Sequence, residues 1–148
     1  MIALVQRIAK AQVTVEEEIT GSADAGLLVY IGVEKQDTDD DAAFIARKIP
    51  GLRIFPDDKD KMNLGLLDIS GSILAISNFT LCGNCRKGRR PGYDNAAPPE
   101  QAERLFDLTI EMIRSRGVKV ETGVFGAHMD IENTSDGPVN LILRSQNE

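Results

Sequence analysis

Residues 71–93, GSILAISNFTLCGNCRKGRRPGY, carry the pattern that decides the fold. The stretch opens with a glycine and an apolar, β-branched run, which predicts a buried strand over 73–81. The run turns polar at Ser77 and Asn78 and soon becomes strongly basic. A buried strand that ends in hydroxyl and amide groups beside a cationic loop can place hydrogen-bond donors next to a phosphate-bearing substrate.

The composition limits the class of protein. With 148 residues and 42% hydrophobic content, the chain is expected to form one domain over 1–148 with a buried core. No segment approaches the ~18 consecutive apolar residues of a membrane span. The N-terminal residues lack the layout of a signal peptide, so we expect a cytosolic protein without membrane contacts.

The charge is unevenly distributed. A net charge of −6 argues against non-specific binding to nucleic acid, and no DNA partner is expected. The densest basic cluster nevertheless lies in the stretch quoted above and consists of Arg86, Lys87, Arg89 and Arg90. A local cationic patch on an acidic protein suits a substrate that is contacted at one end.

Apolar alternation and apolar runs predict a sheet. The run 26–33 is bounded by glycines and almost continuously apolar, which is typical of a central strand. The strands expected along the chain are 2–8 continuing as 11–15, 19–21, 26–33, 52–55, 62–69, 73–81, 118–124, 128–133 and 139–143.

Two helices are expected. Thr38 or Asp37 can cap the first, its acidic first turn is favoured by the helix dipole, and Pro50 ends it. The second begins near Pro98 and ends before Gly117. Because strands are grouped rather than alternating with helices, we expect an α+β fold with a curved, barrel-like, mainly antiparallel sheet and two principal helices on one side.

The two cysteines, Cys82 and Cys85, have the C-x-x-C spacing of redox sites. The residues that follow cannot form the helix such a site uses, and a structural zinc would need two more ligands although His128 is the only histidine. An incidental pair or a labile disulfide remains. No metal and no cofactor is expected.

The sequence contains no classical catalytic set, phosphate-binding loop or dinucleotide fingerprint. The candidate groups are Ser77, Asn78, Thr80 and the backbone amides at the strand end, which could form an oxyanion hole. From the residues alone, the interpretation of Ser77 and Thr80 as ordinary strand residues is favoured. A second candidate is the segment 135–139, SDGPV, which is either a plain corner between strands or a rigid wedge at a pocket edge, with a Gly-Pro bond that tolerates cis.

A resemblance favours the functional alternatives. The chain resembles the D-aminoacyl-tRNA deacylase family along its whole length and in the same order. The matching motifs are Gln6-Arg7, Arg53-Ile54-Phe55, Lys61-Met62-Asn63-Leu64, Ser77-Asn78-Phe79-Thr80-Leu81, Arg86-Lys87-Gly88-Arg89-Arg90-Pro91, Ala96-Ala97-Pro98, Thr122-Gly123-Val124-Phe125-Gly126-Ala127 and Asp136-Gly137-Pro138-Val139.

This resemblance implies a homodimeric hydrolase that cleaves the ester of D-aminoacyl-tRNA, and also glycyl-tRNA formed on tRNA(Ala), in translation quality control. It implies that the backbone amides of Phe79 and Thr80 polarise the ester carbonyl. A cis Gly137-Pro138 wedge from the partner would exclude L side chains, with Arg7 as its support. The roles implied are catalytic for Ser77, Phe79 and Thr80, substrate-binding for Asn78, Phe125, Ala127, Met129, Gly137 and Pro138, and tRNA-binding for Arg86, Lys87, Arg89 and Arg90.

Three residues depart from the family pattern. Asn78 stands where the family usually has Gln, Asn140 where it has Thr, and His128 where an acid is common. Family members are described with either the motif threonine as nucleophile or the 2′-hydroxyl of the tRNA assisting. We favour the second because no paired base accompanies Thr80. The competing classes are a non-enzymatic RNA-binding module that uses the basic loop and a C-x-x-C redox protein.

Overall fold

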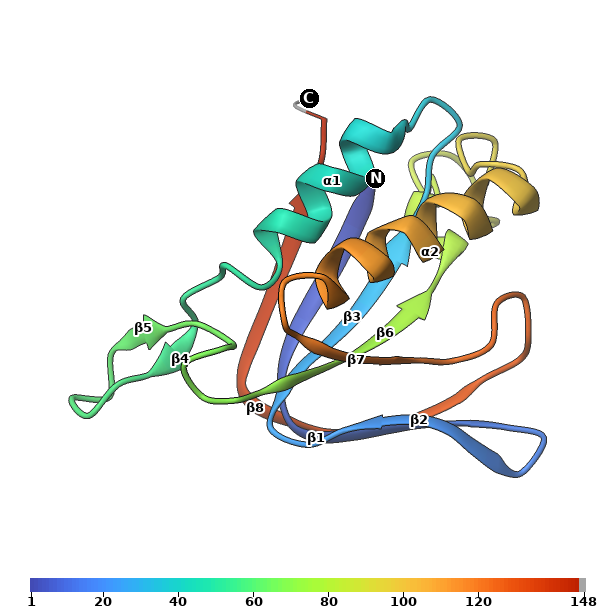
Figure 1. The fold of residues 1–148 in the computed structure, drawn as a ribbon. Helices are drawn as coiled ribbons and strands as arrows, with labels where there is room; N and C mark the ends of the chain where they lie inside the picture. The colour runs from blue at the N-terminus through green and yellow to red at the C-terminus, as the bar shows by residue number, and fades with distance from the viewer. Residues whose placement is uncertain (147–148) are drawn as a thin grey trace.

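A computed structural model describes residues 1–146, so the last two residues of the expected domain lie outside the described part. Figure 1 shows a strongly curved sheet with both helices on one of its faces. The elements are β1 (Ile2–Val15), β2 (Glu18–Ala23), β3 (Gly26–Gly32), α1 (Asp39–Lys48), β4 (Phe55–Pro56), β5 (Met62–Leu64), β6 (Ser72–Ser77), the 3-10 helix η1 (Phe79–Cys82), α2 (Pro99–Arg114), β7 (Lys119–Thr122) and β8 (Asp130–Arg144).

The main sheet has the order β2-β1-β3-β6-β7, with β8 on the other side of β1. Every pairing of β1 is antiparallel, whereas β6 is parallel to both β3 and β7. The sheet nearly closes where β2 approaches β7, because the Ser22 N–H donates to the Glu121 carboxylate at 2.7 Å. This bond and the bond from Lys119 lower the pKa of Glu121. The expected barrel-like α+β fold is confirmed.

The curved sheet is buried on both faces. Leu27, Val29 and Ile73 pack under the two helices, while Leu28 and Leu74 pack in a second cluster inside the curve. Burial on both faces explains why 26–33 reads as an unbroken apolar run instead of alternating. The central position predicted for this strand is therefore confirmed.

Gly26 allows a close backbone approach between β3 and β6. A Cβ atom at Gly26 would lie 2.0 Å from the carbonyl oxygen of Ser72, its partner in the parallel ladder. We expect Gly26→Ala to lower the free energy of unfolding by about 3 kcal/mol, because backbone on both sides must move. Urea denaturation measures this change. Gly51→Ala is the control, since its Cβ would meet its nearest atom at 3.4 Å; equal midpoints for the two variants would contradict the prediction.

Helix α1 begins as predicted at Thr38, whose N–H donates to Asp41 at 2.8 Å. The alternative cap, Asp37, has another role. Its carboxylate is buried, accepts the Glu34 N–H at 2.6 Å and contacts the Met1 ammonium at 2.5 Å. Asp37 therefore joins the start of the chain to the α1 entry, a contact that local sequence does not reveal.

Four strand predictions were too long, among them 118–124, of which only Lys119–Thr122 forms a strand. Of the predicted 52–55 only Phe55 lies in a strand, β4. Of the predicted 62–69 only Met62–Leu64 does, because a turn over 66–71 takes up the end of the segment. The predicted strand 73–81 ends at Ser77, and Phe79 to Cys82 form a 3-10 helix. The cause is Asn78, whose side chain accepts a hydrogen bond from the Thr80 N–H and caps that helix.

The last two predicted strands are one strand, β8. It follows β1 over Asp130–Arg144, and the ladder is interrupted between the pairs Ile8↔Ser135 and Gln6↔Asn140. Residues 136–139 therefore lie opposite Arg7 without pairing with β1, while the ladder continues on both sides of them. We call these four residues the excursion. The interpretation of this segment as a simple corner between two strands is wrong, because β1 runs past it without a break.

Candidate active site

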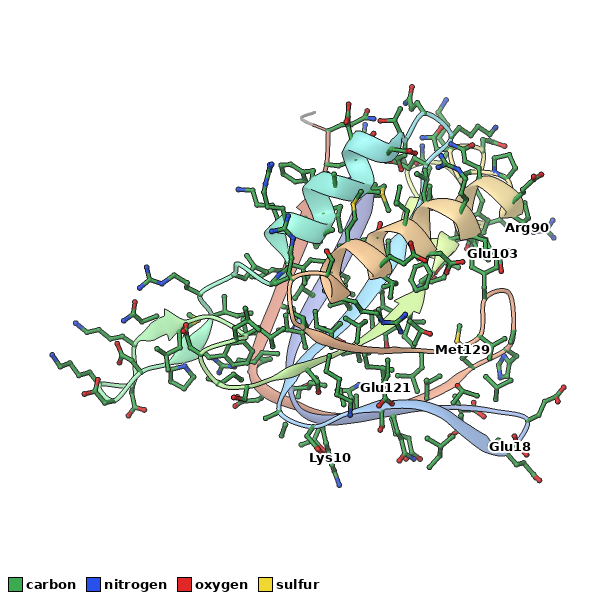
Figure 2. The ribbon with its side chains drawn as sticks, in the orientation of Figure 1. Lys10, Glu18, Arg90, Glu103, Glu121 and Met129 are labelled. Atoms are coloured by element: carbon green, nitrogen blue, oxygen red, sulfur yellow. The ribbon has the colours of Figure 1, made fainter. Side chains whose placement is uncertain are left out.

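The polar residues that end β6 line a cavity of about 750 Å³, within the size range of small-ligand sites. Its walls come from β6, η1, the start of α2 and the loop 125–129 between β7 and β8. In Figure 2, Met129 is drawn on this loop. The cavity brings together seven of the residues predicted for the site: Ser77, Asn78, Phe79, Thr80, Phe125, Ala127 and Met129.

The polar wall is organised by Asn78. Its Oδ1 accepts the Thr80 N–H at 3.1 Å and the Thr80 hydroxyl at 2.5 Å. Of the two amides that the resemblance assigns to the ester carbonyl, the Thr80 amide is thus already engaged. The Phe79 N–H is at the first position of the 3-10 helix and has no intrahelical acceptor.

The titratable side chains among the lining residues are Tyr30, Tyr93 and His128. Burial raises the pKa of Tyr30, so its phenol stays neutral at physiological pH. His128 is exposed and lies 3.6 Å from Asp130, which is also exposed. The lining residues therefore offer hydroxyls, amides, one imidazole and apolar surface, and no carboxylate or thiol. Such a wall can bind and polarise a neutral ester, whereas it is poorly suited to acid–base catalysis by carboxylates.

The four predicted basic residues form an exposed loop next to the cavity. A bridge between Asn84 and Gly92 closes this loop, and the following residue, Tyr93, lines the cavity. In Figure 2, Arg90 is drawn at the end of the molecule where α2 begins. The four side chains are exposed and are not part of the cavity wall: Arg86, Lys87, Arg89 and Arg90.

Gly137 and Pro138 lie outside the cavity of their own chain, in the exposed excursion of β8. Their peptide bond is cis, as the resemblance implies. Arg7 holds the excursion: its Nε lies 3.1 Å from the Asp136 carbonyl oxygen and 3.0 Å from the Asp136 carboxylate. The Arg7 Nη1 donates to the Ile54 carbonyl at 2.6 Å, so the guanidinium joins β1, β8 and the segment before β4.

The sequence matches the family described as D-Tyr-tRNA(Tyr) deacylase over residues 4–144. The chain belongs to this family. A D-aminoacyl-tRNA deacylase of Pelobacter propionicus is 52% identical over 97% of this chain and 99% of its own length. The protein of the same name from Bacillus cytotoxicus is 52% identical over 99% of this chain and all of its own.

The fold is also that of solved structures. The structure of a protein named c-Myc DNA Unwinding Element Binding Protein superposes with a TM-score of 0.93 at 35% identity, covering 99% of this chain and 100% of that one. This fold is therefore shared with a solved structure of related sequence. Within the described residues, no helix is long and apolar enough to cross a membrane.

The site of this deacylase family member contains one feature that the sequence did not indicate. Phe79 and Tyr93 form an edge-to-face aromatic pair at the cavity, with ring centroids 5.1 Å apart. Phe79 is 56% exposed and Tyr93 39% exposed. Nothing in the local sequence marks Tyr93 as a site residue. It lies next to η1 because the bridge between Asn84 and Gly92 closes the intervening loop.

The cysteines do not form a redox pair in the structure. Both are free; Cys82 is buried and its Sγ lies 3.4 Å from the Val33 carbonyl oxygen, while Cys85 is exposed. Burial, with the negative charges of Glu34 and Asp37, raises the pKa of the Cys82 thiol to about 11. A thiol that is protonated at neutral pH is a poor nucleophile, which argues against the redox class.

We expect iodoacetamide at pH 8 to modify Cys85 rapidly and Cys82 only after denaturation. The reason is that Cys82 is inaccessible and its thiolate appears only as the pH approaches the raised pKa of about 11. Mass spectrometry of tryptic peptides counts the label at each position. In Cys85→Ser, the folded protein should take up no label; rapid labelling of that variant would contradict the assignment.

Proposed function

We propose that the protein hydrolyses the ester between a D-amino acid and the 3′-terminal adenosine of tRNA, releasing the free amino acid and tRNA. The observation that supports this most directly is a cavity of about 750 Å³ with a wall of hydroxyl and amide groups, in a member of the D-Tyr-tRNA(Tyr) deacylase family. An aminoacyl-adenosine is a suitable size for such a cavity. The reaction belongs to translation quality control.

The proposed chemistry uses few titratable groups. The Phe79 N–H polarises the ester carbonyl, and Ser77 and Thr80 orient the reacting end. The lining provides no carboxylate or thiolate base, and its one imidazole, His128, is exposed to solvent beside Asp130. We therefore assign activation of the attack to the 2′-hydroxyl of the substrate's own ribose. Phe125, Ala127 and Met129 form the apolar wall that receives the adenosine.

D selectivity is proposed to come from a second copy of the chain. Gly137 and Pro138 are exposed and lie outside the cavity of their own chain, so in a homodimer these residues of one protomer can enter the cavity of the other. An L side chain would then meet this wedge, and chirality is selected by exclusion. Glycine has no side chain to exclude, which makes glycyl-tRNA formed on tRNA(Ala) a further substrate.

The basic loop is proposed to bind the tRNA near its acceptor end, in the cytoplasm. Its four cations lie beside Tyr93 at the cavity, so phosphates of the terminal nucleotides can reach them while the ester enters. The whole chain, 1–148, acts as one deacylase domain. A non-enzymatic RNA-binding module remains the competing function, and it predicts binding without turnover.

Deacylation of matched D-tyrosyl-tRNA and L-tyrosyl-tRNA tests the proposal. The expected result is rapid loss of the D ester with the L ester spared, and no inhibition by added duplex DNA. Sedimentation of the same sample should show a dimer. If tRNA binds and neither ester is cleaved, the chain is an RNA-binding relative of the family, and the departures at Asn78 and Asn140 become the first positions to revert.

A further inference from the structure

The contact between Asn78 and Thr80 fixes the direction of a hydroxyl proton. A backbone N–H can only donate, so the Asn78 side-chain atom 3.1 Å from the Thr80 nitrogen must be the amide oxygen and not the amide nitrogen. The same oxygen lies 2.5 Å from Thr80 Oγ1. Because an amide oxygen carries no proton, the Thr80 hydroxyl is the donor in this short contact.

A threonine hydroxyl has one proton and two acceptor lone pairs. In Thr80 the proton is directed to Asn78, within the same short segment that caps η1. The lone pairs are thus the groups that Thr80 can offer to the cavity, which it lines. A ligand atom that contacts Thr80 Oγ1 must accordingly carry a hydrogen to donate.

We infer that Asn78 is a positioning residue that makes Thr80 a hydrogen-bond acceptor for the substrate. This inference rests on the proposed function, because the reacting end of an aminoacyl-adenosine offers two donors of the required kind: the α-ammonium group and the 2′-hydroxyl. The ester carbonyl has no hydrogen and must therefore be bound elsewhere. A nucleophilic threonine would need its proton taken by a base, and a neutral amide oxygen is too weak a base for that role.

The chain-specific part of this inference is the length of the side chain at 78. The Asn78 amide reaches Thr80 two residues later in an Asx-type contact, which is the local bond this side chain favours. Asn78→Asp keeps an oxygen in the same place and should keep the hydroxyl direction, whereas Asn78→Ala removes it.

The test is binding of non-hydrolysable analogues in which D-tyrosine is joined to adenosine through a 3′-amide. The complete analogue is compared with one lacking the 2′-hydroxyl and one in which hydrogen replaces the α-amino group, using calorimetry on the wild type, Thr80→Ser and Thr80→Val. Thr80→Val is expected to weaken the complete analogue about tenfold, and Thr80→Ser to restore it. Thr80→Val should cause no loss of affinity for the analogue that lacks the group donating to Thr80. That analogue therefore identifies the donor.

Equal weakening of all three analogues by Thr80→Val, or no weakening of any, would overturn the inference. So would an acyl group on Thr80 detected by mass spectrometry of a quenched reaction with D-tyrosyl-tRNA. Because the analogues are not turned over, this result is separate from the proposed function, which fails only if the wild type binds no analogue or cleaves no ester.

Hydrogen exchange at the Thr80 amide provides a readout of the Asn78 contact without substrate. Exchange should be slow in the wild type and in Asn78→Asp, and faster in Asn78→Ala, which should also reduce the affinity for the complete analogue. If Asn78→Ala leaves both the exchange and the affinity as in the wild type, Asn78 does not position Thr80.

Discussion

Replacing the four cations of the basic loop with alanine should lower kcat/KM for D-tyrosyl-tRNA by about 100-fold at low salt, because about four phosphate contacts are lost. The dependence of log kcat/KM on log salt concentration should become shallower by about 3. Steady-state deacylation at several salt concentrations measures both. The replaced residues are Arg86, Lys87, Arg89 and Arg90.

A substrate without phosphates separates binding from chemistry. D-tyrosyl-adenosine should be cleaved equally by the wild type and the loop variant, because the four side chains are not part of the cavity wall. A charge-matched control replaces four exposed cations on other elements and should retain activity toward the tRNA ester: Lys10, Lys59, Lys61 and Arg116. Equal losses in the loop variant and this control would assign the effect to net charge alone.

Arg7→Met should lower the D-over-L discrimination by about 100-fold and the free energy of unfolding by about 3 kcal/mol, the cost of removing charge-assisted bonds from a largely buried group. The Arg7 side chain is 11% exposed and joins Asp136 to the Ile54 carbonyl. Without it, the excursion that carries Gly137 and Pro138 loses its attachment to β1. Deacylation of both tyrosyl-tRNA esters, well below the melting temperature, measures the discrimination.

Two further variants separate the parts of this effect. Arg7→Lys keeps the charge and loses the planar guanidinium, which donates to several acceptors at once. Relative to Arg7→Met, it should therefore recover the free energy of unfolding more than the D-over-L discrimination. Asp136→Asn removes only the half-exposed carboxylate, which lies on the solvent side of the pair, and should cost less than 1 kcal/mol. Unchanged discrimination in Arg7→Met, with the loss confined to stability, would exclude the excursion from chiral selection.

The parts of the fold that sequence predicted are those decided by local pattern. β3 and both helices follow from burial on two faces, from caps and from breakers, and their positions are as expected. The end of β6 was missed, although Asn78 before Phe79 is a capping signal in its own right. The apolar side chains of Phe79 and Leu81 favour a continuing strand in the local pattern and so oppose the signal of the cap.

Other features could not be predicted because they depend on residues far apart in the chain. Residues 130–144 form a single strand because they pair with β1. Asp37 has its role because its carboxylate binds the ammonium group of Met1. The site shows the same division. Ser77, Asn78 and Thr80 are suggestive by chemistry alone, but only the family resemblance pointed to Phe125 and Met129, which the tertiary fold brings to the same cavity.

The number of residues in the excursion 136–139 also determines which side chains of β8 face each side of the sheet. Between the pairs Ile8↔Ser135 and Gln6↔Asn140, β8 takes five residue steps while β1 takes two. Odd-numbered Ile131 therefore faces the inside of the curve, whereas odd-numbered Leu141 and Leu143 face the helices. Deleting one residue from 136–139 would turn that final segment over and expose its apolar side. Changes in length here are tolerable only in steps of two, which restricts how this loop can diverge among relatives.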